Sequence, residues 1–463
     1  MISLRENMKV LVAGLGYRTG LAACNFLAAR KCRVTGSDMK GADELQPVLE
    51  RMDPSVRVVA GHQDPSLLDE SFDLIVLSPG VPQSIPLIAA ARKRGIPVIS
   101  EIELAYGFMK GQIIAITGTD GKSTTTMLTG HILRELGINS LVGGNIGIPL
   151  ISLVDRMEEE TVSVIELSSF QLETIESFRP DAAAMLNVTP DHLDRYAGME
   201  DYFRAKMRIT QNQAEGDAFV YYKDDAVIKS GLDGVRARKL SFSLEDAGAD
   251  AFLRSGIICL RDGADLREFL AMSRLSILGA HNALNVMASV LMVRSVLEKR
   301  GAVLDYEKAA EACRSFTGLP HRMETIGDYQ GRVFINDSKA TTVGAVEMAL
   351  KSLGSNTVLI LGGRTKGDDY SRLAAVLEGR IKGLVLIGES RESFSRIFTA
   401  SHPVEASSLE EALVQAMRMT GAGDTVILSP ACASFDMFAN YEERGNRFKD
   451  AFKKLKRGEL SWT

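Results

Sequence analysis

A glycine-rich loop between an apolar run and a helical stretch gives the strongest signal for chemistry. The run from Gly111 to Thr117 is typical of a buried strand, and the string Gly118-Thr-Asp-Gly-Lys-Ser123 follows it. Backbone N–H groups of such a loop at a helix N-terminus form a cradle for phosphate. There Lys122 would reach the β- and γ-phosphates of a nucleotide, and Ser123 would bind Mg²⁺. Standard spacing requires a glycine where Ile116 stands, so an ordinary glycine turn is the alternative.

Three ionisable residues stand near the ends of neighbouring elements in the same stretch of chain. Glu166 ends the apolar run from Val162, His192 follows the run from Ala182, and Lys206 lies in a helical stretch. Since ligands gather at the strand ends of an open α/β sheet, a carboxylate and an imidazole there could hold a metal beside the loop. Taken singly, each has a plainer interpretation: a solvated strand end, a turn histidine and a surface lysine.

A second glycine-rich turn lies near the N-terminus, in Gly14-Leu-Gly16-Tyr-Arg-Thr-Gly20, with Asp38 at the end of the next apolar run. Glycines there permit a tight turn and a close approach of the backbone to a diphosphate, and the acidic residue can bind a ribose. The spacing GxGxxxG is one residue longer than the dinucleotide fingerprint. The alternatives are a packing turn without a ligand and a site for NAD or NADP.

The second half of the chain carries several clusters of polar residues. Asn282 and Asn285 lie three apart at a helix start, so they share one face and could bind a ligand or cap the helix. The last third places polar and cationic residues after several apolar runs, as a site for a carboxylate-bearing substrate would. These residues lie in Pro320-His-Arg322, Asn336-Asp-Ser-Lys-Ala-Thr341, Lys366 and the string from Leu428 that contains Ser434.

All these residues are distributed over three blocks in which strand-like apolar runs alternate with helical stretches. This alternation predicts α/β domains, each built on a parallel sheet covered by helices. Short, turn-broken strands from Phe219 to Leu278 indicate a β extension of the second block, which a helix from Asn282 to Leu297 closes. We expect domains at 1–100, 101–317 and 318–463. Strands are expected to begin near Lys9, Arg33, Phe72, Pro97, Gly111, Val162, Ala182, Val333, Thr357, Gly383 and Asp424.

The bulk composition limits the classes of function. The 463 residues carry a formal net charge of −5 and are 45% hydrophobic, which argues against a nucleic-acid partner and against disorder. The five cysteines are scattered and odd in number, which favours free thiols in a reducing compartment. No apolar run approaches the ~20 residues that a membrane helix needs. We therefore expect a cytoplasmic protein without a membrane partner, and from chemistry alone an ATP-using α/β enzyme with a mobile third domain.

The string Thr117-Gly-Thr-Asp-Gly-Lys-Ser-Thr124 resembles the TGTNGKST loop shared by the Mur ligases and folylpolyglutamate synthetase. The order of Glu166, His192, Lys206, the HNxxN helix, the HR pair and the DSKAT string also matches that superfamily. The third-block strings LGGxxKGxDY and SPACASFDxFxNYExRGxxF are similar to the D-glutamate-adding members of the Mur ligase family. There is no DNPR motif of the diaminopimelate-adding members. One departure is Asp120, which replaces the usual asparagine and puts an acidic side chain near phosphates.

The resemblance implies a fold and an activity. The fold would be three α/β domains: a Rossmann-like N-terminal domain, a central P-loop ATPase-like domain with a β extension, and a Rossmann-like C-terminal domain. The activity would be ATP-dependent ligation of D-glutamate to UDP-N-acetylmuramoyl-L-alanine through an acyl phosphate, in a monomer. Because different domains would hold ATP and the amino acid, domain closure would assemble the site.

The resemblance also implies a role for each candidate residue. The catalytic group would be Lys122, Glu166, His192 and Lys206, with Ser123 and Glu166 on one Mg²⁺ and His192 and a carbamylated Lys206 on a second. ATP would be bound by Gly118, Thr119, Asp120, Gly121, Lys122, Ser123, Thr124, Asn282, Asn285, Arg322 and Asp337. The UDP-sugar would be bound by Gly16, Thr19, Asp38, Ser78 and Asn145. D-glutamate would be bound by Lys339, Thr341, Lys366, Ser434, Phe435 and Tyr441.

Four other functions compete with this interpretation. Another Mur ligase would differ in its amino acid, and folylpolyglutamate synthetase would lack the N-terminal domain. A nucleotide-binding regulator would leave the polar third block unexplained. A dehydrogenase would rest on the first glycine loop alone.

Overall fold

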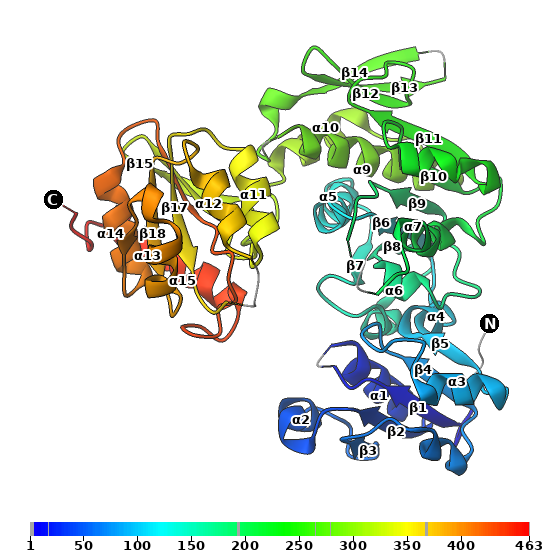
Figure 1. Cartoon of the computed structure of the whole chain (residues 1–463). Coiled ribbons are helices and arrows are strands. Elements are labelled where there is room, and N and C mark those ends of the chain that lie inside the picture. Colours follow the sequence, from blue (N-terminus) through cyan, green and yellow to red (C-terminus); the bar gives the residue numbers. More distant parts are fainter. Residues whose placement is uncertain are drawn as a thin grey trace. The chain divides into compact units, whose positions relative to one another are not determined.

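The computed structural model describes residues 4–16, 18–191, 195–263, 265–277, 279–365 and 369–462. The chain divides into two compact units (Figure 1), one of Met1–Leu275 with Ala280–Phe316 and one of Ser276–Gly279 with Thr317–Thr463. Among the described residues, no helix is long and apolar enough to cross a membrane.

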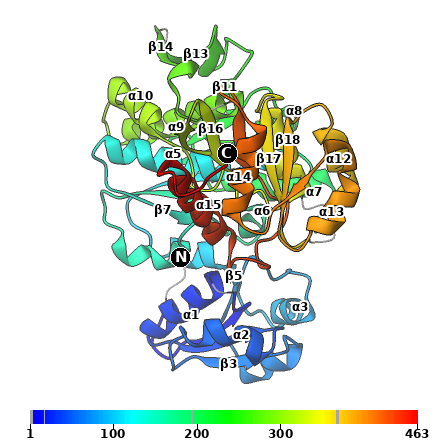
Figure 2. The same ribbon diagram turned by 90° about the vertical axis from the view of Figure 1, so that its left-hand side faces the viewer.

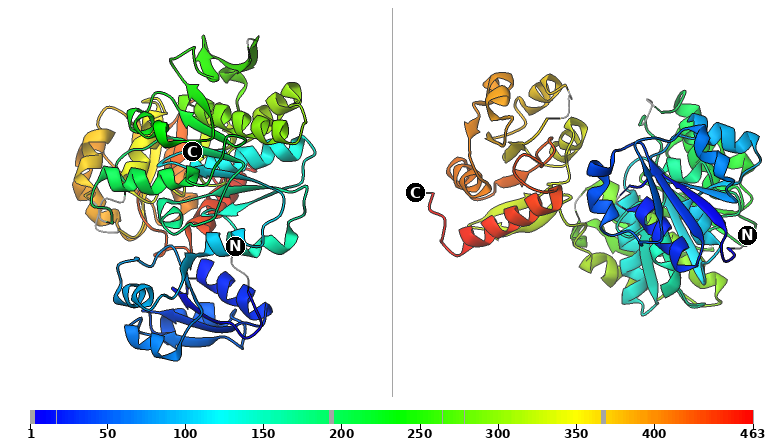
Figure 3. Two further views of the ribbon diagram at one scale, coloured as in Figure 1. Left: turned by 90° about the vertical axis from the view of Figure 1, so that its right-hand side faces the viewer. Right: turned by 90° about the horizontal axis from the view of Figure 1, so that it is seen from below.

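The first sheet is wholly parallel, with strand order β3-β2-β1-β4-β5. Its blue strands lie side by side in Figure 3. The strands are β1 (Lys9–Ala13), β2 (Arg33–Asp38), β3 (Arg57–Ala60), β4 (Leu74–Leu77) and β5 (Val98–Ser100). Four of the five strands were predicted; β3 was missed because its four residues are only partly buried.

Helices cover both faces of this sheet (Figure 2). Val10 and Val12 of β1 pack with α1 and α2, while the alternate residues Leu11 and Ala13 pack with α3 on the other face. Strand residues alternate between faces, so a strand with two apolar faces is buried on both sides. These helices, and α4 that follows β5, are α1 (Thr19–Ala29), α2 (Ala42–Leu49), α3 (Pro86–Lys93) and α4 (Glu101–Tyr106).

The central sheet has the strand order β14-β13-β12-β11-β10-β9-β6-β8-β7. The predicted β extension continues this same sheet: β10 and β11 run parallel to it, and only β12, β13 and β14 form antiparallel pairs. The first strands are β6 (Gln112–Thr117), β7 (Ser140–Gly144), β8 (Val162–Glu166) and β9 (Ala182–Met185). The others are β10 (Ala218–Tyr222), β11 (Arg238–Ser243), β12 (Ala251–Arg254), β13 (Ile257–Asp262) and β14 (Asp265–Ala271).

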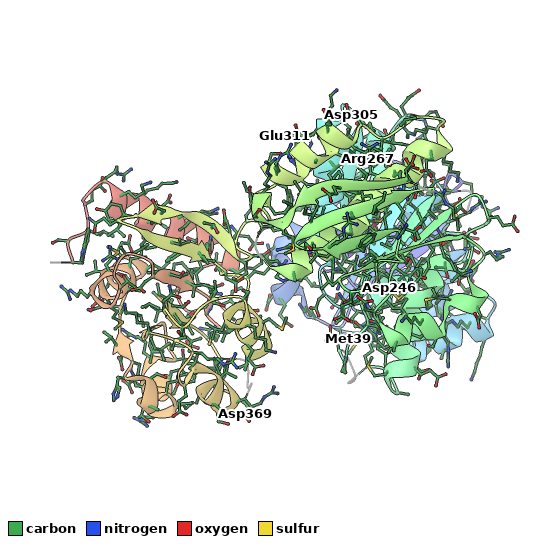
Figure 4. All side chains as sticks on the ribbon, turned by 90° about the horizontal axis from the view of Figure 1, so that it is seen from above. Met39, Asp246, Arg267, Asp305, Glu311 and Asp369 are labelled. Atoms are coloured by element: carbon green, nitrogen blue, oxygen red, sulfur yellow. The ribbon has the colours of Figure 1, made fainter. Side chains whose placement is uncertain are left out.

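Helices α5 and α9 pack against each other beside the central sheet, and α10 lies near β14. Figure 4 shows Arg267 of β14 and, at α10, Asp305 and Glu311; the Arg267 guanidinium carbon lies 4.5 Å from the ring centre of Tyr306. The helices of this part are α5 (Lys122–Glu135), α6 (Ser169–Leu172), α7 (Met199–Met207), α8 (Ala226–Ser230), α9 (Ala280–Lys299) and α10 (Tyr306–Ser315). One hydrophobic cluster runs from the first sheet through α4 into the central sheet, which explains why both belong to one unit.

The third sheet, in the second unit, has the order β15-β16-β20-β17-β18-β19 and is parallel except for β15. Leu359 and Leu361 face one hydrophobic cluster and Val358 and Ile360 face the other, so helices cover both sides. The strands are β15 (Glu324–Tyr329), β16 (Arg332–Asn336), β17 (Thr357–Gly362), β18 (Gly383–Ile387), β19 (Val404–Glu405) and β20 (Thr425–Leu428). The helices are α11 (Val343–Lys351), α12 (Ser371–Leu377), α13 (Arg391–Ile397), α14 (Leu409–Met419) and α15 (Tyr441–Lys456).

Three mainly parallel sheets confirm the predicted class of three α/β domains. In this unit β16, β17, β18 and β20 were predicted, whereas the edge strands β15 and β19 were not. Edge strands are short or polar and lack the continuous apolar pattern of a strand buried on both faces.

Candidate active site

The glycine-rich loop predicted to bind phosphate, called the phosphate loop below, has the predicted strand–loop–helix form. Buried β6 ends at Thr117, and α5 begins at Lys122. Gly118 has φ +148° and Gly121 has φ +79°, a region that side chains other than glycine rarely adopt. A Cβ on Gly121 would also lie 2.7 Å from Asn285 Oδ1. Both glycines are therefore required by backbone conformation, and Gly121 also by close packing.

Asn187, two residues beyond β9, holds the loop in place. Its Oδ1 accepts from the backbone N–H groups of Thr119 at 3.1 Å and Asp120 at 2.7 Å, and its Nδ2 donates to the Asp120 oxygen at 3.1 Å. Sequence reasoning missed Asn187; its place directly after a buried strand was the available signal. The Asp120 residue is exposed, and its charge is near enough to Lys206 to raise that lysine's pKa in part.

Two lysines meet at the main-chain oxygen of Gly118. Lys122 Nζ donates to it at 2.9 Å and to the Thr119 oxygen at 2.6 Å, and Lys206 Nζ donates to it at 2.7 Å. Lys206, on α7, is 1% exposed. Burial, and secondly the charge of Lys122, lower the pKa of Lys206 to about 7. A large share of this amine is thus neutral and nucleophilic near neutral pH.

Glu166 ends β8, and its Cα is paired with that of Ile116 in the neighbouring β6. The residue is 2% exposed; Oε1 accepts from Asn145 Nδ2 at 2.7 Å. Its other carboxylate oxygen, Oε2, is buried and has no hydrogen-bond partner within the described residues. A buried carboxylate oxygen without a partner is costly unless a cation completes its environment. Glu166 therefore fits a hard cation such as Mg²⁺.

Asn282 and Asn285 lie in the first two turns of α9 and are both buried. Asn285 Nδ2 donates to Asn282 Oδ1 at 2.9 Å, and Asn285 Oδ1 accepts from the Thr125 hydroxyl at 3.0 Å. Asn285 thus braces α5 just behind the phosphate loop. The predicted contact of this pair with adenine stays a prediction.

In the first domain, Asp38 braces the glycine turn. Its carboxylate accepts from the backbone N–H groups of Leu15 at 2.7 Å and Lys40 at 3.0 Å. Ser78 Oγ donates to the Gly14 oxygen at 2.6 Å. A Cβ on Gly20 would meet that same oxygen at 2.0 Å, so strand and helix approach closely there. Gly16 has open space at its Cβ position.

Arg18 joins this turn to the central domain. Its guanidinium donates to the main-chain oxygens of Asn145 at 3.3 Å and Gly147 at 2.5 Å. Thr19 begins α1 directly after it. The structure therefore brings Thr19 and Asn145, two predicted UDP-sugar residues, to the same junction through Arg18, which sequence reasoning missed.

In the second unit, the loop after β16 is built around buried polar groups. Asp337 is 5% exposed; its oxygens accept from the Met323 N–H at 3.1 Å and the Ser429 hydroxyl at 2.8 Å. Burial raises the pKa of Asp337 to about 6. The positive charge of the half-buried Arg322 is near enough to offset part of this rise in the pKa of Asp337. The structure thus brings together the two residues predicted to meet ATP from the third domain.

The residues predicted to bind the amino acid gather at the loops after β16 and β20. The Lys339 Nζ lies 5.6 Å from the ring centre of Tyr441, and the Thr341 N–H donates to the Lys339 oxygen at 2.8 Å. Ser434 is buried, whereas Phe435 is 63% exposed. His192 and Lys366, also predicted, lie outside the described residues.

The chain matches models of three protein domains along its length. These are a Mur ligase MurD-like N-terminal domain over residues 8–100, a Mur ligase middle domain over 116–293 and a Mur ligase glutamate ligase domain over 321–432.

Curated relatives match almost the whole chain. UDP-N-acetylmuramoylalanine--D-glutamate ligase of Geobacter sp. (strain M21) is 43% identical over 98% of this chain and 99% of its own. The enzyme of the same name from Geotalea daltonii is 44% identical over the same shares.

Solved structures support the fold alone. UDP-N-acetylmuramate-alanine ligase MurC from Thermotoga maritima covers 97% of this chain and all of its own, with a TM-score of 0.58 at 19% identity. MurF from Acinetobacter baumannii covers 97% of this chain and 94% of its own, with a TM-score of 0.56 at 15% identity. The chain belongs to the Mur ligase family, in the branch of the UDP-N-acetylmuramoylalanine--D-glutamate ligases.

Proposed function

We propose that this chain joins D-glutamate to UDP-N-acetylmuramoyl-L-alanine at the expense of ATP, as a step of peptidoglycan synthesis. The observation that carries the assignment is the match of about 43% identity over 98% of the chain to ligases named for this reaction. The phosphate loop supports the use of ATP, and the polar loops of the third sheet support an anionic amino-acid substrate.

The proposed reaction has two steps. An oxygen of the alanyl carboxylate attacks the γ-phosphorus of ATP, the bond to the bridging oxygen breaks, and ADP leaves. The D-glutamate amine then attacks the acyl carbon of the resulting acyl phosphate; inorganic phosphate leaves and the amine loses its proton. The protein must align the reactants, neutralise charge and exclude water, because water would hydrolyse the intermediate.

Mg²⁺ supplies charge neutralisation to the phosphates when it is bound. Ser123 at the start of α5 and the free oxygen of Glu166 would hold one ion, and His192 with a carbamylated Lys206 would hold a second. The partly neutral, buried amine of Lys206 supports the carbamate, because only a neutral amine reacts with CO₂. The carbamate would turn a cation into an oxygen ligand suited to Mg²⁺.

The remaining residues would bind the three substrates. Lys122 would stabilise the transferring phosphoryl group and the glycine loop would cradle the phosphates, with Asn282 and Asn285 on the adenine side and Arg322 with Asp337 from the third domain. Gly16, Thr19, Asp38, Ser78 and Asn145 would bind the UDP-sugar. D-glutamate would meet Lys339, Thr341, Lys366, Ser434, Phe435 and Tyr441. A monomer in the cytoplasm, with domains at 1–100, 101–317 and 318–463, completes the proposal.

Phosphate release from ATP tests the assignment. The enzyme is supplied with UDP-N-acetylmuramoyl-L-alanine, UDP-N-acetylmuramate or a folate, each with D-glutamate, L-glutamate, L-alanine or D-alanine. We expect release only with UDP-N-acetylmuramoyl-L-alanine and D-glutamate together. Robust turnover of UDP-N-acetylmuramate with L-alanine would contradict the assignment.

A further inference from the structure

Arg444, in α15, has an unusual environment for an arginine. The residue is 1% exposed and ranks among the largest fully buried side chains. Its Nε donates to Ser338 Oγ at 2.9 Å, and Nη2 donates to the Ser338 oxygen at 2.8 Å and the Cys432 oxygen at 3.1 Å. Its Nη1 also donates to the Cys432 oxygen at 3.1 Å. All four of these bonds end on neutral oxygens.

These acceptors belong to two loops at the carboxyl ends of neighbouring parallel strands. Ser338 lies between Asp337 and Lys339 in the loop after β16, and Cys432 lies two residues before Ser434 in the loop after β20. The loop after β17, the other neighbour of β20, approaches as well, because a Cβ on Gly363 would lie 3.3 Å from Arg444 Nη1. The guanidinium therefore lies at the meeting point of three loops.

The same loops also hold each other in conformations that need support. Ala431 has φ +53°, which is unfavourable for a residue with a Cβ, and its N–H donates to the Ala340 oxygen at 2.9 Å. Ala433 and Arg364 exchange two backbone hydrogen bonds, at 2.9 and 3.0 Å. Strained backbone persists only where surrounding contacts fix it. The planar guanidinium, with donors in a rigid fork, is suited to fixing several carbonyl groups at once.

We propose that Arg444 is the positioning residue of the amino-acid site: its guanidinium fixes the loops that present Lys339, Thr341 and Ser434 to the substrate. This inference rests on the proposed function. The side chain does not touch the substrate in this account. None of the four hydrogen bonds reaches a carboxylate, and the nearby Asp436 stabilises the buried positive charge only in part. Burial lowers the pKa of Arg444 to about 10, so the group is cationic at neutral pH and favours an anionic amino acid nearby.

Steady-state kinetics with each substrate varied in turn tests this role. Arg444→Met removes the fork and the charge, and we expect the KM for D-glutamate to rise at least ~10-fold. The KM for UDP-N-acetylmuramoyl-L-alanine should stay within ~2-fold of wild type. The KM for ATP should rise less than that for D-glutamate, because the loop after β16 also carries Asp337. Arg444→Lys keeps the charge but not the fork, and should give an intermediate KM for D-glutamate. Ser338→Ala, which removes one acceptor, should raise that KM ~3-fold or more.

Arg447 on the same helix is the matched control. It is exposed and pairs with Glu443 at 3.7 Å, so Arg447→Met should leave all three KM values within ~2-fold. Equal rises in all three KM values of the Arg444 variants, or a lower kcat with unchanged KM values, would overturn the positioning role. If Arg444→Met does not unfold cooperatively on heating, it is not properly folded. In that case Ser338→Ala tests the role, again by whether the KM for D-glutamate rises selectively. A wild-type enzyme without D-glutamate-dependent phosphate release would overturn the proposed function itself.

Discussion

The side-chain amide of Asn145 donates to Glu166 Oε1 across 2.7 Å, and this contact leaves the second oxygen of Glu166 buried and unpartnered among the described residues. The Asn145 main-chain oxygen accepts from Arg18 of the first domain. One residue thus connects the turn predicted to bind the UDP-sugar with the carboxylate predicted to bind Mg²⁺. Contacts that orient a metal ligand commonly change metal affinity by ~10–100-fold when they are removed.

Asn145→Ala should therefore raise the Mg²⁺ concentration needed for half-maximal activity by ~10-fold or more. Glu166→Gln should lower activity further, because the charged ligand itself is lost. A Mg²⁺ titration of phosphate release measures both effects. The exposed Asn139 is a suitable control, and Asn139→Ala should leave the titration unchanged. An unchanged Mg²⁺ requirement in Asn145→Ala would show that the contact between Asn145 and Glu166 does not contribute to metal binding.

Lys122→Ala should yield a folded protein whose activity is reduced by ~10³-fold or more, since the lost charge acts mainly on the transferring phosphoryl group. The measurement is kcat for phosphate release, with circular dichroism to check the fold. Lys110→Ala, an exposed lysine just before β6, is the control. Near wild-type turnover of Lys122→Ala would place the ATP site elsewhere.

Lys206→Ala should lose most activity, and small carboxylates such as acetate or formate should partly restore it by occupying the vacant ligand position. Lys206→Arg should not respond, because its side chain fills the space and forms no carbamate. The readout is phosphate release at increasing carboxylate concentration. Electron density of an active complex that ended at the Lys206 nitrogen, together with activity indifferent to CO₂ removal, would disprove the carbamate.

Glu101 gives a prediction for stability against pH. The residue is 1% exposed at the start of α4, and its Oε1 accepts from the Ile151 N–H at 2.6 Å. Burial raises its pKa from 4.5 to about 7. The folded protein then holds the proton more tightly than the unfolded chain. Binding of this proton contributes about 3 kcal/mol to the free energy of unfolding, and the contribution is fully present below pH 4.5. It is lost as the pH rises towards about 7.

Glu101→Gln removes this dependence. The free energy of unfolding of Glu101→Gln minus that of wild type should therefore increase as the pH rises from 4.5 to 7. Denaturant unfolding at several pH values measures the difference, and the exposed Glu135→Gln serves as the control. If the difference in free energy of unfolding between variant and wild type stayed constant across that range, the raised pKa of Glu101 would be contradicted.

Patterns of apolar residues in this sequence predict some elements of the fold and miss others. Strands buried on both faces, such as β1, β6 and β17, and the long helix α9 carry continuous apolar patterns, and these predictions were confirmed. The edge strands β3, β15 and β19 carry no such pattern. The order of strands within a sheet depends on packing between residues far apart in sequence, which periodicity does not encode.

The candidate site shows the same division. Glycine spacing predicted the turn between β6 and α5, because backbone conformation restricts which residue can stand there; phosphate binding by this turn stays a prediction. Asn187, Arg18 and Arg444 were missed, since each acts through contacts with residues more than 60 positions away. The residue type alone carries no sign of such a contact; for Asn187, its place after a buried strand was the one local signal.

The fate of oxygen in the substrate carboxylate tests the ligase mechanism most directly. UDP-N-acetylmuramoyl-L-alanine labelled with ¹⁸O in both alanyl carboxylate oxygens is incubated with ATP, Mg²⁺ and D-glutamate, and the products are analysed by mass spectrometry. Attack of the carboxylate on the γ-phosphorus predicts inorganic phosphate that carries one ¹⁸O and an amide product that keeps the other. Phosphate without ¹⁸O, or no D-glutamate-containing product, would contradict the account.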